Sequence, residues 1–258
     1  MFNIFNDLDK LGFTQVPEPD AIFCPKQERQ SKKADKENHD ITHYVLLKKR
    51  LCPVCGGIFA DVMLRTTKCR LLHSDTDLRA HYSPFDPIYY DVILCDFCGY
   101  AAMNSHFDHL SEKQVDLISE AVRPQYRYKE YPLMLSSVEA AERYLLALLC
   151  ATVKRARSSE KAMLCLRLAW LSRDQKEAER EQEFLSYALK GFELAYEKEE
   201  CPIYGMESVT LCYLMGELSR RVGRRDEAMR YISRVITSPS ASNRLKERAR
   251  DVRDLMKK

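Results

Sequence analysis

The spacing of hydrophobic residues changes about 110 residues from the start of the chain. Before that point, short runs of β-branched and aromatic residues alternate with turn residues, which is typical of short strands. After it, hydrophobic residues recur every three or four positions and glycine becomes rare, which is typical of amphipathic helices. The pattern therefore predicts an α+β protein, mainly α, in which a small β module precedes an antiparallel helical stack.

Three strands are predicted in the front part, each from a run of β-branched and aromatic residues. The first and third runs lead directly into a pair of cysteines, so both pairs are expected where a strand ends. The predicted strands cover residues 41–51, 58–69 and 88–94.

The first 40 residues have a different composition. Residues 2–13 form a short amphipathic segment, and residues 17–40 form a polar linker rich in charged and amide side chains. We therefore expect an N-terminal segment and linker over residues 1–40 and a β module over residues 41–110.

Seven helices are predicted behind the β module, and prolines separate several of them. The last helix has one apolar stripe on an otherwise charged surface, which suits the closing element of a stack. That stripe consists of Leu245, Ala249, Val252 and Met256. The helices are expected at residues 111–123, 136–157, 159–173, 175–199, 206–222, 226–237 and 241–257. Together they define a helical domain over residues 111–258.

Two parts of this helical domain are similar to tetratricopeptide units, which are paired helices that meet at small residues. In residues 206–240, Gly216 stands at the expected close approach, Gly223 is expected in the turn, and Asp226 is expected to cap the next helix. A longer unit is expected over residues 162–200. Such units stack and leave a concave groove that usually holds a peptide or a partner helix. A plain helical bundle without a ligand is the alternative.

Two Cys-X-X-Cys-Gly motifs carry the most specific chemistry in the chain. Cys52 and Cys55 form one pair, and Cys95 and Cys98 form the other. Two residues between cysteines let both sulfur atoms face one point, and four thiolates complete the tetrahedron of a closed structural zinc site. The motifs therefore predict one structural zinc ion in a zinc-ribbon-like module. Because 39 residues separate the pairs, the segment between them must form a substantial loop or subdomain.

Other roles for these and neighbouring residues remain open. Each pair also fits a thioredoxin-like redox motif, although such a motif opens a helix, whereas glycine follows each pair here. A second metal could use Cys69 with His73, or His106 with His109. The charged residues between the pairs could form salt bridges or supply a catalytic carboxylate. They include Arg65, Lys68, Arg70, Asp75, Asp77, Arg79 and Asp86.

Composition indicates a globular, soluble protein, with 45% hydrophobic and 31% charged residues in a chain of 258. No apolar run approaches the roughly 18–20 residues of a membrane span, and the chain begins without a basic, apolar leader. We therefore expect a cytoplasmic protein whose cysteines stay reduced. Among the other cysteines, Cys150, Cys165 and Cys212 lie in apolar helical stretches and are expected to be buried.

Charge is unevenly distributed, although the net charge is only +3. Residues 220–258 contain 13 basic and 5 acidic residues, a balance of +8, whereas residues 181–217 contain 2 basic and 8 acidic residues, a balance of −6. These blocks are either binding faces or solvated helix faces.

The front half also resembles a known family. The resemblance rests on the runs Lys49–Cys55, Thr67–Arg70, Pro87–Val92 and Cys95–Ala101, together with Asp75 and Asp77. These runs are similar to bacterial proteins grouped as domain of unknown function 2225, over roughly residues 41–235. Asp96 stands where that family often has proline. The resemblance implies a bacterial cytoplasmic protein with a metal-binding front and a helical rear, and it implies no particular activity.

Together these features favour a non-enzymatic, zinc-stabilised adaptor or scaffold that binds a protein or peptide partner through its helical domain. The chain has no phosphate-binding glycine loop, nucleophile elbow or HExxH motif. A second hypothesis is nucleic-acid binding through the zinc module and the basic C-terminal helices. A third is an enzyme with a site in residues 65–90, which requires a cleft beside Asp75, Asp77, His73 or His81 with shifted pKa values. No membrane partner is expected.

Overall fold

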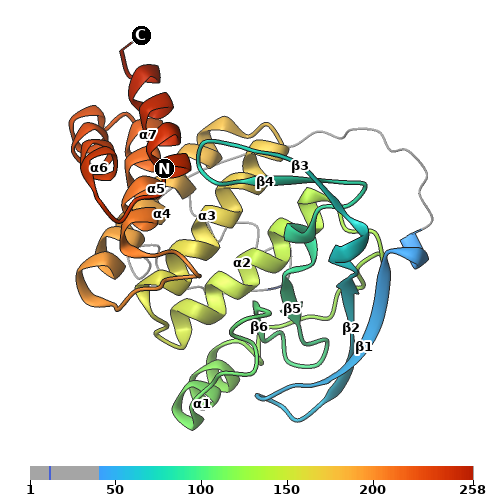
Figure 1. The fold of residues 1–258 in the computed structure, drawn as a ribbon. Coiled ribbons are helices and arrows are strands. Elements are labelled where there is room, and N and C mark those ends of the chain that lie inside the picture. The colour runs from blue at the N-terminus through green and yellow to red at the C-terminus, as the bar shows by residue number, and fades with distance from the viewer. Residues whose placement is uncertain (1–11, 13–40, 258) are drawn as a thin grey trace.

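The structure is a computed structural model that describes residues 12 and 41–257. Within residues 41–257 it has six short β-strands and seven α-helices, so the predicted α+β, mainly helical fold is confirmed. Figure 1 shows helices α2 to α7 stacked on one side and the hairpin β1–β2 on the other. Apart from Gly12, the segments predicted over residues 2–13 and 17–40 lie outside the described residues.

The strands pair as three separate antiparallel hairpins. β1 (Val45–Leu51) pairs with β2 (Ile58–Leu64), β3 (Arg70–Ser74) with β4 (Ala80–Ser83), and β5 (Val92–Leu94) with β6 (Ala101–Met103). The first two predicted strands are present but shorter than expected, because 3₁₀ turns replace their outer ends. The hairpin β3–β4 and strand β6 were not predicted.

The third predicted strand starts late because its beginning is a 3₁₀ turn, Pro87–Tyr90. Asp86 caps this turn, and its carboxylate accepts a hydrogen bond from the Ile88 backbone N–H at 3.1 Å. Proline at the first position favours the turn because its fixed φ suits it and its missing N–H is not needed there. Only Val92–Leu94 then continues as a strand.

All seven predicted helices are present within residues 41–257, each bound lying within four residues of the expected one. Several begin at serine caps, and Ser136 and Glu139 form a reciprocal capping box at the start of α2. The helices are α1 (Glu112–Ala121), α2 (Ser137–Val153), α3 (Ser158–Asp174), α4 (Ala178–Lys198), α5 (Ser208–Arg221), α6 (Arg225–Thr237) and α7 (Asn243–Leu255). No helix among the described residues is both long and apolar enough to span a membrane.

One continuous core joins the hairpin β5–β6 to helices α2–α5. All six residues of β5 and β6 are buried, and the Ala101 backbone N–H donates to Cys150 Sγ on α2 at 3.4 Å. The hairpin β1–β2 contributes only Phe59 to this core. The β hairpins and the helices thus share a core, and the division into domains at residues 41–110 and 111–258 stays a prediction.

Helices α5 and α6 form a close pair with the features expected of a tetratricopeptide unit. A Cβ atom at Gly216 would lie 2.8 Å from Ile232 Cδ1, so only glycine lets the two helices approach this closely. Gly223 has the positive φ of a turn residue, +80°. Asp226 is not the N-cap that was predicted, because α6 begins one residue earlier and Asp226 lies in its first turn.

The apolar stripe predicted on the last helix is confirmed. Ala249, Val252 and Met256 are buried, and Leu245 packs beside them against the pair α5–α6. Cys150, Cys165 and Cys212 are buried as expected.

The hairpin β3–β4 crosses from the other hairpins to the helical stack (Figure 1). Its turn contacts α5, where the Thr76 hydroxyl donates to Glu217 at 2.6 Å and the Tyr213 hydroxyl donates to the Thr76 carbonyl at 2.7 Å. The turn also contacts α3, where Trp170 Nε1 donates to Asp77 at 3.1 Å. The turn therefore lies against α3 and α5, the first helix of each predicted pair.

Candidate metal centre

Each cysteine pair lies at the tip of a hairpin, and the two tips have the same backbone geometry. In the first, the Cys52 N–H donates to the Gly57 carbonyl at 2.9 Å and the Gly56 N–H donates to the Cys52 carbonyl at 3.0 Å. In the second, Cys95 and Gly99 make the equivalent bonds, also at 2.9 and 3.0 Å. Gly56 and Gly99 have φ values of +69° and +73°, which glycine adopts without strain.

These two tips bring the four sulfur atoms together. Cys52 Sγ lies 3.6 Å from Cys98 Sγ, Cys55 Sγ lies 3.7 Å from Cys95 Sγ, and all four lie within 4.8 Å of one another. Metal–sulfur bonds of about 2.3 Å in a tetrahedron place neighbouring sulfurs roughly 3.8 Å apart. The four cysteines chosen from the sequence thus have the spacing of a metal site, and three of them are buried.

Electrostatics within this group favour a bound cation. Contacts with Cys95 and Cys98 lower the pKa of Cys52 to about 4. The contact with Cys52 instead raises the pKa of Cys98, and burial adds to that increase. Adjacent thiolates repel each other in a buried site, so ionisation of one thiol opposes ionisation of its neighbour. A divalent cation removes this restriction and allows all four thiols to ionise.

The redox interpretation of the cysteine pairs does not agree with the structure. A thioredoxin-like pair opens a helix, whereas the first pair here leads into β2 and the second into β6. Every cysteine in the described part of the chain is a free thiol. The sulfurs also approach each other between the pairs, which suits a shared ion.

The alternative metal ligands are arranged differently from either proposed pair. Cys69 Sγ lies 4.0 Å from the Arg65 carbonyl and packs against the cluster around Tyr90, and it does not share a metal-binding group with His73. His106 contacts the Ser105 hydroxyl at 2.8 Å and the ring of Tyr204, away from any metal-binding group in the described residues. His73 instead lies with Asp75 and His81, residues that the sequence indicated for an enzyme site and not as a shared set of metal ligands.

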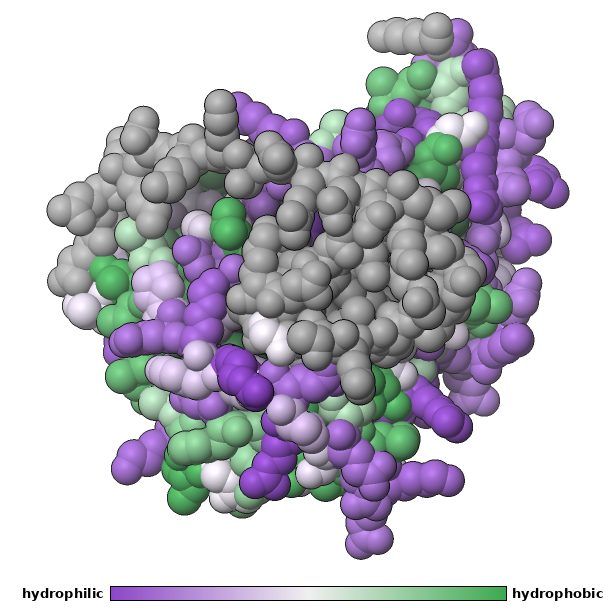
Figure 2. All heavy atoms as spheres, turned by 180° about the vertical axis from the view of Figure 1, so that it is seen from behind, coloured by the Kyte–Doolittle hydropathy of each residue, from purple (hydrophilic) through white to green (hydrophobic). Residues whose placement is uncertain are grey.

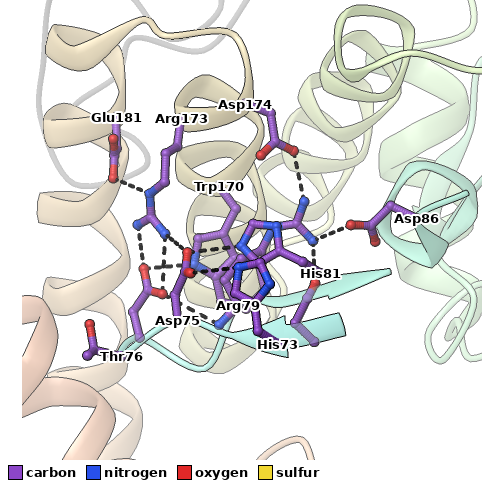
Figure 3. Close-up of polar contacts among 12 residues, drawn as sticks. His73, Asp75, Thr76, Arg79, His81, Asp86, Trp170, Arg173, Asp174 and Glu181 are labelled. Carbon is purple, nitrogen blue, oxygen red and sulfur yellow. Dashed lines mark hydrogen bonds and ion pairs between the residues drawn. The ribbon is translucent and has the colours of Figure 1, made fainter. Parts of the chain in front are cut away.

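Several charged residues between the cysteine pairs form ion pairs with the helices, as Figure 3 shows. Arg173 on α3 donates to Asp75 at 2.7 Å and to Glu181 at 2.8 Å, and it also pairs with the fully buried Asp77. Arg79 is buried and pairs with Asp86 and Asp174, both at 2.8 Å. The salt-bridge interpretation therefore holds for Asp75, Asp77, Arg79 and Asp86.

A cleft of about 440 Å³ lies between hairpin β1–β2, the β3–β4 turn and helix α3. Arg50 and Asp61 in its wall pair at 2.8 Å, and Arg79 pairs with Asp86. Among the described residues that line it, none is histidine, cysteine or serine. His73, Asp75, Asp77 and His81 do not line it, although Leu78, Ala80 and Tyr82, their neighbours in the chain, do.

Comparison with known proteins identifies one family that the chain matches. A family model described as "Uncharacterized protein conserved in bacteria (DUF2225)" matches residues 46–256. No curated protein and no solved structure matches the chain. The match agrees with the resemblance seen in the sequence and extends it through α7.

Proposed function

We propose that this chain, which belongs to the bacterial family DUF2225, is a zinc-stabilised adaptor that binds a protein partner on the outer face of hairpin β1–β2. Four thiolates leave no open position on a tetrahedral ion, so this centre suits a structural role. Thiolate ligands in this geometry select zinc over magnesium or calcium, which prefer oxygen. The ion would hold two hairpins together and so fix the shape of the surface that they present.

The observation that carries this proposal is an exposed group of large apolar side chains around the metal centre, here called the apolar patch. Leu51 and Ile58 are cross-strand partners and are 63% and 64% exposed. Phe97, in the second cysteine turn, is 61% exposed, and its ring lies against Gly57 beside Ile58. Leu47, on the same face of β1 as Leu51, is also 63% exposed. Contiguous exposed apolar surface of this kind marks interaction sites.

The opposite face of the same hairpin explains why these residues point outward. Phe59 and Asp61 on β2 are buried, and Asp61 pairs with Arg50 at 2.8 Å. A shift of one residue in register would exchange the two faces and expose Phe59. The buried ion pair and the aromatic ring therefore fix the register that leaves the apolar patch in solvent.

Charge beside the apolar patch indicates the kind of partner. Lys49, which lies between Leu47 and Leu51 on the same face of β1, is exposed. A protein surface with an apolar centre and an acidic rim complements such a patch in both hydrophobicity and charge. We therefore assign the patch to a protein partner of that composition.

This placement differs from the groove of the helical domain, the binding site expected from the sequence. The β3–β4 turn contacts Trp170 and Tyr213 on the first helix of each predicted pair, which leaves less of those helices for a partner. The patch has no such internal occupant among the described residues, since its members are more than 60% exposed.

Nucleic-acid binding has less support from the distribution of charge. Figure 2 shows hydrophilic side chains covering the C-terminal helices, and many of them are basic. Several are neutralised within the chain, because Arg220 and Arg221 both pair with Glu217 and Arg250 pairs with Glu247. Glu247 is already counted in the +8 balance of residues 220–258, so the pairs with Glu217 lower the positive charge available to a polyanion by one further unit.

The test is capture of partners from a bacterial lysate, followed by reconstitution with the purified partner. The chain, the variant Leu51→Asp and the control Leu255→Asp are compared; Leu255 is 44% exposed on α7, remote in the chain from the patch. We expect a partner that stays bound at about 0.5 M salt, where exposed charge pairs are screened. In calorimetry Leu51→Asp should weaken its binding at least about tenfold, whereas Leu255→Asp should leave it unchanged.

Two results would overturn the proposal. Equal affinity of the purified partner for Leu51→Asp and for the unaltered chain would show that the apolar patch is not the binding surface. Loss of every captured partner at about 0.5 M salt would favour polyanion binding instead.

A further inference from the structure

A second group of metal-binding side chains lies on the hairpin β3–β4, which is separate from the cysteine hairpins. His73 on β3 and His81 on β4 are cross-strand partners, next to an irregularity in register between Leu71 and His73. Such irregularities redirect side chains. The two imidazole rings lie parallel, with centroids 4.4 Å apart and planes 13° apart. Figure 3 shows both rings beside Asp75.

Asp75 completes a group of three ligands. Its Oδ2 lies 3.1 Å from His81 Nε2, and its Oδ1 lies 3.8 Å from His73 Nε2. Metal bonds of 2.0–2.2 Å to nitrogen and oxygen place neighbouring ligand atoms roughly 3.0–3.4 Å apart. All three ligand atoms lie within 4.8 Å of one another, so small side-chain rotations bring them to bonding positions.

The carboxylate is held in place by the helical stack. Arg173 donates to Asp75 Oδ2 at 2.7 Å, and Arg173 is itself fixed by Asp77 and Glu181. Oδ2 therefore lies between Arg173 and His81, and Oδ1 lies nearer His73. A ligand oriented by an outer hydrogen bond in this way is common in metal sites.

The local charge tolerates a cation despite the nearby Arg173. At the contact between the β3–β4 turn and helices α3–α5, four carboxylates face three guanidinium groups. These are Asp75, Asp77, Glu181 and Glu217, opposite Arg173, Arg220 and Arg221. One negative charge is left over, which a bound cation would balance.

The two histidines differ in a way that suits an open metal site. His81 Nε2 is buried and, although it lies at ion-pair distance from Asp75, it has no hydrogen-bond partner with suitable geometry. A buried polar atom without a partner is costly unless something else satisfies it. The His73 side chain is 63% exposed, so water can reach the same point.

We propose that His73, Asp75 and His81 bind a divalent first-row transition metal ion, with its remaining coordination positions open to water. Two imidazoles and one carboxylate suit zinc, cobalt, nickel or ferrous iron, and they suit calcium or magnesium poorly. This site is chemically distinct from the closed cysteine centre, and it does not depend on the adaptor function. Water molecules at its open coordination positions would be exchangeable.

The proposal is tested with the full chain purified with zinc in the cysteine centre and then titrated with Co²⁺. Native mass spectrometry counts the ions, and calorimetry measures the affinity. We expect one additional ion per chain. His73→Gln should weaken its binding at least tenfold, because the two remaining ligands, Asp75 and His81, cannot compensate for the lost imidazole. The control His109→Gln, at an exposed histidine outside both groups, should bind as the unaltered chain does.

Absorption spectroscopy separates binding at this site from replacement of zinc. Cobalt bound by four thiolates absorbs strongly in the near ultraviolet through sulfur-to-metal charge transfer, whereas cobalt bound by imidazole and carboxylate does not. We expect the added ion to lack that band while the zinc content stays constant. No additional ion at pH 7.5, or equal binding by His73→Gln and the unaltered chain, would overturn the proposal. Because His73 is largely exposed, its replacement does not disturb a packed core.

Discussion

In the helical stack, apolar side chains fill the space between successive helices, whereas the cysteine hairpin β1–β2 has little apolar surface to bury. Helix α2 alone buries eleven residues, almost all apolar. β1 buries only Val45, and the buried residues of β2 include the charged Asp61. Isolated two-stranded hairpins are at best marginally stable in water. Packing therefore stabilises the rear of the molecule, whereas polar and metal contacts must stabilise much of the front.

The two cysteine turns also differ in how closely they pack against the core. The second turn is attached to the core through β5–β6 and through Tyr126, whose ring atoms would lie 2.4 Å from a Cβ at Gly99. The first turn has no atom within 4 Å of the equivalent position at Gly56. The first turn therefore depends on the shared ion for its position more than the second does.

The largest expected effect comes from removing one thiolate of the metal centre. Cys52→Ser should abolish tight metal binding and destabilise the front hairpins by several kcal/mol, because binding a structural zinc ion contributes on the order of 10 kcal/mol to folding. Cys165→Ser, in the packed stack, should cost only about 1–3 kcal/mol for burying a hydroxyl. Thermal unfolding and bound-zinc content measure both variants. Equal, small losses would contradict the comparison.

A smaller effect is expected at the contact between the β3–β4 turn and the stack. Asp77 is fully buried and accepts from Trp170 and Arg173. Asp77→Asn removes the negative charge that faces the Arg173 guanidinium, and it should lower the free energy of unfolding by roughly 3 kcal/mol. Glu247→Gln removes an exposed partner of Arg250 and should cost at most about 0.5 kcal/mol. Urea unfolding midpoints measure the difference, and similar midpoints would show that the buried contact does not hold the turn.

The smallest expected effect is the difference in stability loss between glycine substitutions in the two cysteine turns. Gly56→Ala should cost about 1–2 kcal/mol, because alanine is strained at positive φ. Gly99→Ala has the same strain and in addition must displace Tyr126, so it should cost about 1–3 kcal/mol more. Equilibrium unfolding of both variants tests this. If Gly56→Ala were the more damaging change, the second turn would not be the better anchored one.

The sequence predicted those parts of the fold that depend on neighbouring residues. The helices follow from local periodicity and serine caps such as Ser136, and the cysteine turns follow from two short motifs. The family resemblance was visible for the same reason, since it rests on short runs around those motifs.

The parts that were missed depend on contacts between distant residues. Strand β3 is exposed along most of its length, so its hydrophobic pattern gives no strand signal. Its position is fixed instead by contacts such as Asp77 with Trp170, 93 residues later. The turn residues Asp75–Asp77 between two short runs were the available signal for a hairpin.

The metal ligands illustrate the same limit. Spacing of four residues suggested pairing Cys69 with His73, whereas a hairpin pairs His73 with His81 across its two strands. Phe97 and Ile58 likewise belong to one surface only because the hairpin tips meet. Neither grouping follows from separation along the chain.

The crossing of β3–β4 onto helices α3 and α5 has a consequence for synthesis of the chain. The ribosome releases Cys52 and Cys55 long before Cys98, and Asp77 long before Trp170, Arg173 and Tyr213. Domains usually fold as units, beginning with the N-terminal one, while the rest is still being made. Here the first cysteine pair has to wait until Cys98 is made, and hairpin β3–β4 cannot complete its contacts until translation has passed α5.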